Sequence, residues 1–600
     1  MKIAERKYNE LKEKYQAMIV EQTYIINLIS NIRLVVFLIA TVLGIYFIAQ
    51  KYYGLFVWDI AVFLVLFIPL ILFHDHYFNK KEHSIVLHKI NEDSLKRIHG
   101  EWNSFADDGA EFIDDSHNYS QDLDIFGQGS LFQFINTAIT YLGRLKLRDI
   151  LIAPARSTGE IINRQEAIQE LSQKLDWRQQ YLAEGMLEST MHDPQALFLW
   201  ANKIERFYRN PRVIIIFRLI PVITIIIGIF NFINSKPQYY SLIAALVIQY
   251  VILKINSNQR EYILGVANKF TQNIKAYHKM LSLLEQEEYN SRYLQDLKNK
   301  LKSQGLTAGE QIRKLEKIVE AIANRHNQLY IFFNILLLLD YQFVFALEKW
   351  KEKSGNNLHN WLDIIGEFEA LSSLAVLSYD YSEWTTPELS VEGPVFTAEE
   401  MGHPLLMNSG VPNNLKFEPP ENILLITGSN MSGKSTLLRT VGINLVLAYA
   451  GGNVCARIFK CSIMDIYTCM RVKDNLEKNI SSFYAELLRI KMIVKAVEER
   501  QTIFFLLDEI FKGTNSIDRH TGAKVLIMKL SKAKLLGLVS THDLELGCLE
   551  EESSKIKNYH FQEYYENNQI CFDYKLRPGV SKTRNAAFLM KMAGIEFREE

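Results

Sequence analysis

The sequence predicts a multidomain protein in which an α-helical core and lever carry two transmembrane helical hairpins and precede a C-terminal α/β domain. Three observations support this fold class. Four almost uncharged apolar runs occur as two widely separated pairs, long helix-forming stretches poor in Gly and Pro surround them, and strands alternate with helices after residue 427. The chain has 600 residues, about twice the length at which a single hydrophobic core stops growing.

Composition excludes several classes of protein. The chain has 67 Lys and Arg against 68 Asp and Glu, a net charge of -1, which excludes a basic surface over the whole molecule. A charged fraction of 22% with only 13 prolines excludes a mainly disordered chain. The five cysteines all follow residue 454, are odd in number and form no CxxC, so we expect reduced thiols and neither a disulfide scaffold nor a thiolate zinc site.

The four apolar runs predict two transmembrane hairpins. They cover residues 34–50, 52–73, 213–235 and 237–253. Each is close to the ~20 residues that cross a hydrocarbon core, and each is apolar around its whole circumference, whereas a buried helix of a soluble domain keeps a polar stripe. Four buried core helices are the alternative. We expect hairpins at 34–73 and 213–253 and therefore a multi-pass protein of the cell membrane.

Two hairpins return the chain to the side from which it started. A cleavable signal peptide fits poorly, because the first run begins after 33 mostly polar residues and a second run follows at once. The remaining parts then share one compartment, which we expect to be the cytoplasm, where thiols stay reduced. These parts are an N-terminal helix at 1–33, a linker at 74–125, a first helical core part at 126–212, a second helical part at 254–384 and the α/β domain at 385–600.

The second helical part carries a small excess of positive charge. Residues 255–330 contain twelve Lys and Arg against eight Asp and Glu. A difference of this size is typical of a solvated helix face and only weakly indicates a nucleic-acid surface.

A glycine-rich loop in the α/β domain predicts a phosphate site. The apolar strand at 423–426 leads into GSNMSGKS and then into a helix, which matches the P-loop pattern GxxxxGK[ST] in its required setting. Loop amides and the helix N-terminus converge on phosphate oxygens, Lys434 neutralises the β- and γ-phosphates, and the Ser435 hydroxyl binds Mg²⁺. The expected nucleotide-binding residues are Gly428, Ser429, Asn430, Met431, Ser432, Gly433, Lys434, Ser435 and Thr436.

Two further strand ends complete an expected ATPase site. The apolar strand at 503–507 ends in Asp508 and Glu509, where a P-loop enzyme holds its Mg²⁺ and its water-activating carboxylate. We assign the metal to Asp508 and general-base catalysis to Glu509. A third strand ends in Thr541-His542-Asp543, and His542 is a candidate for sensing the γ-phosphate, although a lone His is more often structural.

These motifs resemble one family. TGSNMSGKSTLLR, LLDEIFKGTN and STHD, in this order, are similar to the ATPase domain of the MutS-type DNA mismatch-repair proteins. Outside the nucleotide site, DLDIFGQGSLFQFIN, RQEAIQEL and LDIIGEFEALSSLA resemble the helical core of the family. GHPLL with VPNNLKF resembles the approach to the P-loop, and YKLRPGVSKTRNAAFLMKMAGI resembles the C-terminal segment. The resemblance covers most of residues 123–210 and 361–597.

The resemblance implies an ABC-type ATPase in which two subunits enclose two ATP molecules, and thus a homodimer. It also assigns Ser481, in NISSFYAEL, to the γ-phosphate bound by the other subunit. Three departures affect base affinity and trans activation. Asn479 and Ile480 replace the usual Gly-Arg, the Arg of GRHP is missing between Gly402 and His403, and Gly410 stands where an aromatic residue commonly stacks on adenine.

The first 125 residues contain an apolar hairpin and no Phe-x-Glu wedge of the kind that reads mismatches. We therefore expect a membrane-anchored MutS-like ATPase for which DNA is a candidate partner without mismatch specificity. The alternative is an ATP-driven transport or membrane-remodelling machine that never meets DNA, against which the absence of LSGGQ argues. A nucleotide-gated scaffold with little turnover is a third alternative, against which the intact Lys434, Ser435, Asp508 and Glu509 argue.

Overall fold

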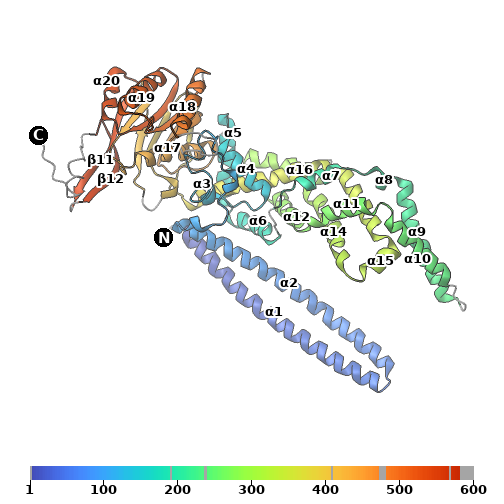
Figure 1. Cartoon of the computed structure of the whole chain (residues 1–600). Coiled ribbons are helices and arrows are strands. Elements are labelled where there is room, and N and C mark those ends of the chain that lie inside the picture. The colour runs from blue at the N-terminus through green and yellow to red at the C-terminus, as the bar shows by residue number, and fades with distance from the viewer. Residues whose placement is uncertain are drawn as a thin grey trace.

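The computed structural model describes residues 3–153, 155–188, 192–234, 239–303, 305–406, 410–471, 482–499, 501–566 and 569–581. The molecule is elongated, with an α/β domain at one end, a helical body in the middle and two projecting pairs of apolar helices (Figure 1). The expected division into a helical region and a C-terminal α/β domain is confirmed.

The first apolar pair is a long antiparallel hairpin of α1 (Ile3–Ala49) and α2 (Tyr53–His99). The turn between the helices uses Lys51 at φ 60, and α2 ends at Gly100, whose φ of 84 gives the left-handed C-cap that favours glycine. The two helices continue the apolar runs into amphipathic stems, whose Leu87 and Ile90 are buried in one cluster with α6 (Leu175–Glu188). The stems therefore fix the hairpin to the helical body.

Residues 74–125 differ from the linker that we expected. Residues 74–99 continue α2, and the acidic stretch that follows folds onto the body through the buried side chains of Trp102, Tyr119, Leu123 and Ile125. The high content of Asp, Gly and Ser suggested a linker, but apolar residues spaced among these polar ones supply enough burial to order the segment.

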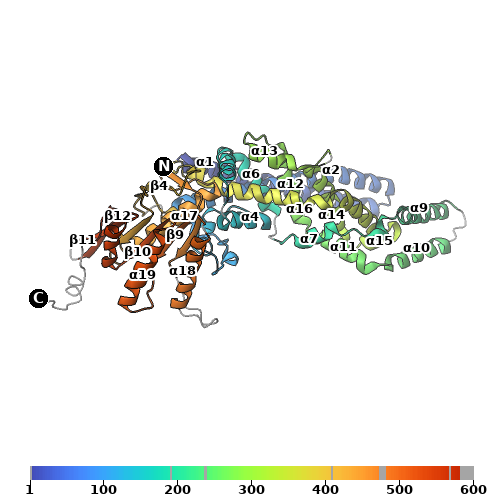
Figure 2. The ribbon, with the colours of Figure 1, turned by 90° about the horizontal axis from the view of Figure 1, so that it is seen from above.

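The helical body is organised around α16 (Leu339–Asp380), a helix of 42 residues that is buried along most of its length. Figure 2 shows it running from the second apolar pair to the α/β domain. The helices packed around it are α3 (Leu131–Ile135), α4 (Tyr141–Ile152), α5 (Thr158–Gln173), α6, α7 (Gln195–Asn202), α8 (Arg206–Arg209), α11 (Ser257–Lys269), α12 (Thr271–Gln286), α13 (Arg292–Lys300) and α14 (Ala308–Ala323).

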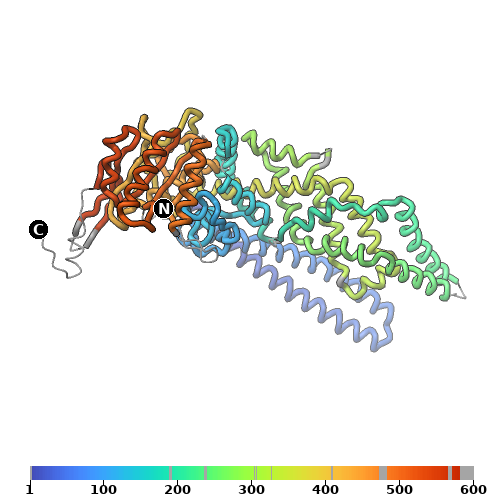
Figure 3. The backbone as a smooth tube through the Cα atoms, turned by 45° about the horizontal axis from the view of Figure 1, so that its top comes forward, coloured from blue at the N-terminus to red at the C-terminus, as the bar shows by residue number. Residues whose placement is uncertain are grey.

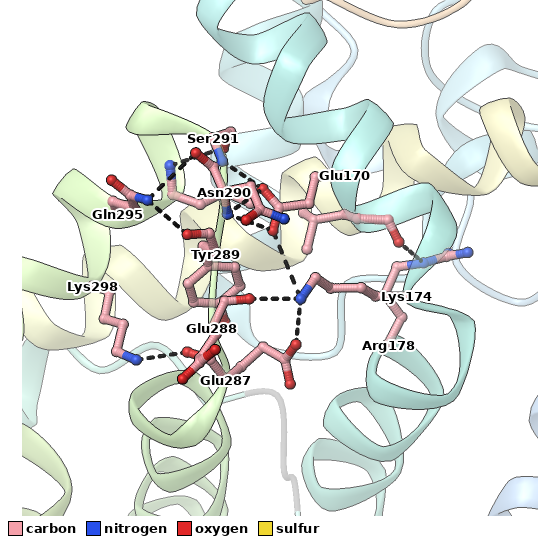
Figure 4. Close-up of polar contacts among 12 residues, drawn as sticks. Glu170, Lys174, Arg178, Glu287, Glu288, Tyr289, Asn290, Ser291, Gln295 and Lys298 are labelled. Carbon is pink, nitrogen blue, oxygen red and sulfur yellow. Dashed lines mark hydrogen bonds and ion pairs between the residues drawn. The ribbon is translucent and has the colours of Figure 1, made fainter.

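A set of polar contacts joins the two parts of the body that the second apolar pair separates in sequence (Figure 4). The carboxylate of Glu170 on α5 accepts hydrogen bonds from the backbone amides of Asn290 and Ser291, at 2.7 to 3.0 Å. The Lys174 ammonium donates to the Glu288 carbonyl at 2.6 Å. The loop before α13 is thereby held against α5, so the body is one structure although the chain leaves it at residue 211 and returns at 254.

The second apolar pair consists of α9 (Pro211–Ile233) and α10 (Tyr239–Lys254). A third apolar helix, α15 (Tyr330–Leu337), packs beside them and bends by 73° into α16. Among the described residues, three helices are long and apolar enough to cross a membrane (α1, α2 and α9), or five if each of two bent pairs counts as one span. The sequence predicted a second helical part at 254–384 without a separate apolar helix, so α15 was not foreseen.

The α/β domain contains a six-stranded sheet in the order β12-β11-β6-β10-β9-β8. All neighbours are parallel except the edge strand β12, which confirms the expected parallel sheet. A second sheet has the order β3-β7-β4-β5. The strands are β3 (Glu388–Ser390), β4 (Phe396–Met401), β5 (Asn413–Lys416), β6 (Ile423–Thr427), β7 (Ile458–Ser462), β8 (Asp465–Cys469), β9 (Ile503–Asp508), β10 (Leu535–Thr541), β11 (Ile556–Glu566) and β12 (Gln569–Pro578).

Helices α17 (Lys434–Ala450), α18 (Ser482–Glu498) and α19 (Ser516–Leu530) pack on the six-stranded sheet (Figure 3). Every residue of β6 and β10 is buried, because both strands lie inside the sheet and are covered on both faces. This burial explains their continuous apolar sequences. It also places the polar residues that follow them at one edge, where parallel strands end together.

Candidate nucleotide site

The glycine-rich loop lies between the buried strand β6 and the first turn of α17. Three of its residues have left-handed backbone conformations, Gly428 at φ 150, Met431 at φ 66 and Gly433 at φ 103. A Cβ atom at Gly428 would come within 3.1 Å of the Phe561 carbonyl, and one at Gly433 within 3.2 Å of the Tyr574 ring. The loop therefore needs glycine at both positions, for its conformation and for the close approach of β11 and β12.

Lys434 is folded back over this loop. Its ammonium donates hydrogen bonds to the carbonyls of Gly428 at 2.9 Å and Ser429 at 2.8 Å, and the side chain is buried. Burial lowers the pKa of Lys434, while the negative charges of Glu509 and Asp508 act in the opposite direction. A buried ammonium at the N-terminus of α17 is a position that an anionic ligand would neutralise.

The next residues of α17 turn toward the same space. Ser435 is half-buried, Thr436 is exposed, and Asn430 and Met431 are exposed on the loop. The Ser432 hydroxyl is buried and has no hydrogen-bond partner in the described part of the chain. Ser429 donates to the Glu563 carboxylate of β11 at 3.0 Å.

The carboxylates predicted from sequence stand on the strand ends beside this loop. Asp508 is the last residue of β9 and is paired in register with Ser540 of β10, whose hydroxyl donates to the Asp508 carboxylate. Thr541 of β10 is paired with Thr427 of β6. The register therefore brings Asp508, Glu509 and His542 to the edge at which the loop begins.

Glu509 is held in an ion-paired state. One carboxylate oxygen lies 2.5 Å from Nε2 of His542, and the other lies 3.0 Å from the ammonium of Lys512. The hydrogen bond from His542 and the charge of Lys512 lower the pKa of Glu509 to about 2, against the opposing effect of burial. Its backbone is left-handed, at φ 52, and its amide donates to the Ser540 carbonyl at 3.0 Å. The side chain is thus an ionised, oriented carboxylate.

Two cavities meet at Glu509. The first has a volume of about 600 Å³ and is lined by the loop, the start of α17, Glu509, Phe561 and Tyr574. The second has a volume of about 670 Å³ and is lined by Glu509, Lys512, His542 and the N-terminal part of α19. The first cavity has the size and the lining of a small-molecule site, because both aromatic and polar side chains line it.

The sequence did not identify Tyr574 as a residue that lines the first cavity. Tyr574 lies on β12 at φ 54 with 43% of its surface exposed, and its carbonyl accepts a hydrogen bond from Asn413 of β5 at 2.9 Å. Gly410, where the sequence lacks an expected aromatic residue, lines the same cavity. Tyr574 belongs to a quoted motif, but only its position in the fold shows that it faces the loop.

His403 forms part of the wall of this cavity. Burial, with the charge of Arg439 as a second cause, lowers its pKa to about 4, so the imidazole is neutral at physiological pH. This chain lacks the Arg of the GRHP motif. The positive charge that lowers the pKa of His403 comes instead from Arg439 on α17.

Ser481 lies outside the described residues, which end at Arg471 and resume at residue 482.

Two acidic residues of the segment that we expected to be a linker join the helical body to the α/β domain. Their partners are the last described residues before residue 472. The buried Asp122 accepts hydrogen bonds from the Thr468 hydroxyl at 2.7 Å and from the amides of Met470 and Arg471 at 3.1 and 2.9 Å. Asp124 pairs with the Arg471 guanidinium. Both aspartates belong to the motif DLDIFGQGSLFQFIN, but their role at this joint was not predicted from the sequence.

The donors at this edge fit a small, hard cation. The Ser435 hydroxyl and the Asp508 carboxylate are oxygen ligands of the type that Mg²⁺ prefers. A softer metal would instead prefer the nitrogen of His or the sulfur of Cys. His520, Asp543 and Glu545 form a separate group whose ligand atoms lie within 4.8 Å of one another, at the rim of the second cavity.

Comparison with known proteins identifies relatives of this domain. The family model of MutS domain V matches residues 424–596. The DNA mismatch repair protein MutS of Aquifex pyrophilus is 26% identical over 508 residues, which cover 78% of this chain and 58% of the relative. The proteins of the same name from Persephonella marina and Carboxydothermus hydrogenoformans are 33% and 31% identical over 39% and 43% of this chain, and over 27% and 31% of their own lengths. The chain thus spans less than two thirds of each of these relatives.

Proposed function

Because this chain belongs to the MutS family through its C-terminal domain, we propose that it is a membrane-anchored ATPase that hydrolyses ATP as a homodimer. The observation that carries the proposal is the convergence of Lys434, Asp508, Glu509 and His542 at one edge of the sheet. A buried cation faces two carboxylates there, and no other group among the described residues is better arranged for phosphoryl transfer to water.

The residues of the loop, Gly428 to Gly433, and Lys434 with Thr436 would bind the triphosphate, and the unpartnered Ser432 hydroxyl favours a polar ligand at this position. Ser435 and Asp508 would hold Mg²⁺, which would supply charge neutralisation between the phosphates when bound. Glu509 would accept a proton from the attacking water, and His542 would orient this carboxylate. Tyr574, which lines the same cavity, would stack on the base.

The homodimer is proposed from the resemblance to the MutS family, and the second cavity beside Glu509 leaves room for a residue of another subunit. This cavity opens next to the residue that we assign to water activation, and Arg471 leads directly from the Asp122 joint into the segment that contains Ser481. We propose that Ser481 of one subunit reaches the γ-phosphate bound by the other.

The membrane anchor rests on the two apolar pairs. In the most apolar stretch of 18 residues of α2, no residue is buried. In the corresponding stretches of α1 and α9, only 6% and 11% of the residues are buried. Surfaces of this size stay out of water only if lipid or protein covers them. We propose hairpins at 34–73 and 213–253 in the cell membrane, with the parts at 1–33, 74–212 and 254–600 in the cytoplasm.

Two partners are candidates for the helical body. DNA is the partner that the names of the relatives suggest, bound through phosphates and without mismatch recognition. An ATP-driven machine that remodels or transports across the membrane is the second candidate. It is favoured by one observation: the far end of α16 lies against α9 and α15, so movements of the ATPase domain would reach the apolar helices through one continuous rod.

Two experiments test this proposal. Carbonate extraction should leave the chain in the membrane pellet, and reporters fused after residues 80 and 300 should both report cytoplasm; release into the soluble fraction would remove the anchor. ATP hydrolysis should then be measured with duplex, branched and single-stranded DNA and with vesicles lacking DNA. Stimulation by DNA supports the first partner, and stimulation by vesicles alone supports the second.

A further inference from the structure

A short uncharged segment projects from the helical body beside the second apolar pair. It covers residues 327–339, which we call the apolar flap, and it contains α15. No residue of α15 is buried, and Leu329, Ile331, Phe332 and Phe333 expose 60%, 62%, 70% and 52% of their surfaces. These four large apolar side chains lie within residues 329–333 and form a patch that water alone would not stabilise.

Polar contacts join the two ends of the flap, which we call its base. The Arg325 guanidinium lies 3.0 Å from the Asp340 carboxylate, which also accepts a hydrogen bond from the Tyr330 hydroxyl at 2.6 Å. The Asp340 amide donates to the Asn334 side chain at 3.0 Å, and Leu338 at φ 51 makes the bend into α16. The segment therefore has a fixed shape, with paired charges at its base and apolar side chains above them.

Hydrogen bonds connect the flap and the start of α16 to the apolar helices α9 and α10. Gln249 of α10 donates from its amide group to the Leu336 carbonyl at 3.2 Å, which satisfies a backbone acceptor at the end of α15. At the start of α16, Tyr341 donates to the Ile252 carbonyl at 3.0 Å, and Gln342 donates to the Phe217 carbonyl of α9 at 3.2 Å. These contacts lie close to the ends at which α9 begins and α10 finishes, so the flap sits at the level where both helices leave the body.

The arrangement in space agrees with this position. Figure 1 shows α15 beside α9 and α10, on the side of the body toward which the α1–α2 hairpin extends, and α15 contacts both helices of the second pair. An eight-residue helix is about 12 Å long, less than half of the ~30 Å of a hydrocarbon core. The flap is therefore long enough to enter one leaflet and too short to cross the bilayer.

We propose that the apolar flap inserts into the cytoplasmic leaflet of the membrane as a shallow third anchor, with the Arg325–Asp340 pair at the lipid–water boundary. This inference rests on the proposed anchoring of the chain by its hairpins. The occupant is lipid because the charged groups at the base are already paired with each other, which leaves the exposed face with little polarity for recognition of a protein. Since α16 starts at residue 339, the flap fixes the end of this rod at the membrane surface.

Fluorescence quenching by lipid tests the inference on the full chain. A Phe332→Cys variant in a Cys548→Ser background, which removes the one cysteine that is exposed among the five, is labelled with an NBD fluorophore and reconstituted into phosphatidylcholine/phosphatidylglycerol vesicles. The signal of the labelled parent chain is subtracted. Val222→Cys, at the middle of α9, reports insertion of the hairpin, and Tyr262→Cys, with 54% exposure on α11, is the matched control outside the flap.

Lipids with a quencher near the headgroup should reduce the emission at position 332 several-fold more than that at position 262, and more than lipids with a quencher near the bilayer centre. Position 222 should show the opposite depth order. Quenching at 222 without quenching at 332 overturns the flap and leaves the hairpin anchor standing, whereas no quenching at either position overturns both. A blue-shifted emission at 332 without lipid quenching shows that protein covers the flap, which also overturns the inference.

Discussion

The Asp122 carboxylate accepts a hydrogen bond from the Thr468 hydroxyl at 2.7 Å and thereby joins the helical body to strand β8 of the α/β domain. The same carboxylate binds two backbone amides, at Met470 and Arg471. An Asp122→Ala variant leaves these buried donors unsatisfied and should lower the free energy of unfolding by on the order of 3 kcal/mol.

Thermal unfolding in detergent measures this effect, with Asp296→Ala, an exposed aspartate on α13, as the control. The variant should also lose ATP hydrolysis at temperatures where it is still folded, because Arg471 leads into the segment of Ser481. A variant as stable as the control would contradict the role of Asp122 as a joint.

The pairing of Glu509 with His542 predicts a stability difference that depends on pH. The pKa of Glu509 is lowered to about 2 from an ordinary value of 4.5. A carboxyl group with a lowered folded-state pKa stabilises the fold above the unfolded pKa and loses this contribution as the pH falls toward the folded pKa. The contribution is therefore complete above pH 4.5 and disappears between pH 4.5 and about 2.

In His542→Ala the main cause of the lowered pKa is removed, so this variant should unfold at a lower temperature than the wild type near neutral pH. The difference should shrink as the pH falls from 4.5 toward 2. His520→Ala, which removes the partner of Asp543 and not of Glu509, serves as the control. A difference that stays constant over this range would contradict the pairing.

Tyr574 should contribute to the binding of the adenine base. A Tyr574→Ala variant should weaken ATP binding by about 1 kcal/mol, roughly fivefold, because it loses one stacked aromatic face, while Tyr574→Phe should bind normally. Tyr564→Ala is the matched control, since Tyr564 lies on the neighbouring strand β11 with 46% exposure and does not line the cavity. Titration with a fluorescent ATP analogue gives the affinities. Equal affinity of both alanine variants would place the base elsewhere.

The strand ends were the part of the site most accessible from sequence. Buried parallel strands have continuous apolar sequences, so the polar residues that follow them, such as Asp508 and His542, could be identified from the sequence. The register of the strands then brings these residues to the same edge of the sheet. Tyr574 was not accessible, because β12 is an edge strand whose direction relative to the loop is set by tertiary pairing. Asp122 was hidden for another reason. It lies in an acidic, turn-rich stretch whose composition is typical of a linker. Only its hydrogen bonds to Thr468 on β8 and to the amides of Met470 and Arg471 show that its side chain is buried.

The apolar helices show a similar division. The runs at 34–73 and 213–253 were evident from hydrophobicity alone. The pair α9–α10 covers nearly the same residues as the second run, whereas α1 and α2 contain the first run and extend it at both ends. The eight residues of α15 are too few to stand out from a helical region, and their exposure depends on the bend at Leu338, which no local pattern announces.

DNA binding, if it occurs, should not discriminate mismatches. The first 125 residues contain no Phe-x-Glu, and the excess of positive charge in residues 255–330 is only four. Contacts to phosphates carry no sequence information and weaken steeply with salt. Titrations of matched and mismatched duplexes at two salt concentrations should give equal affinities that fall together as salt rises. A clear preference for the mismatch would contradict the account of the N-terminal region, and no binding at low salt would favour the membrane machine.

The most direct test of the central claim compares ATP binding and ATP hydrolysis in a Glu509→Gln variant. The amide keeps the size of the side chain and its ability to accept a hydrogen bond from His542, but it cannot take a proton from water. The variant should bind ATP with Mg²⁺ as the wild type does and lose hydrolysis by at least a hundredfold, whereas Lys434→Ala should lose binding. Hydrolysis at the wild-type rate in Glu509→Gln would contradict the assignment of this edge of the sheet as the ATPase site.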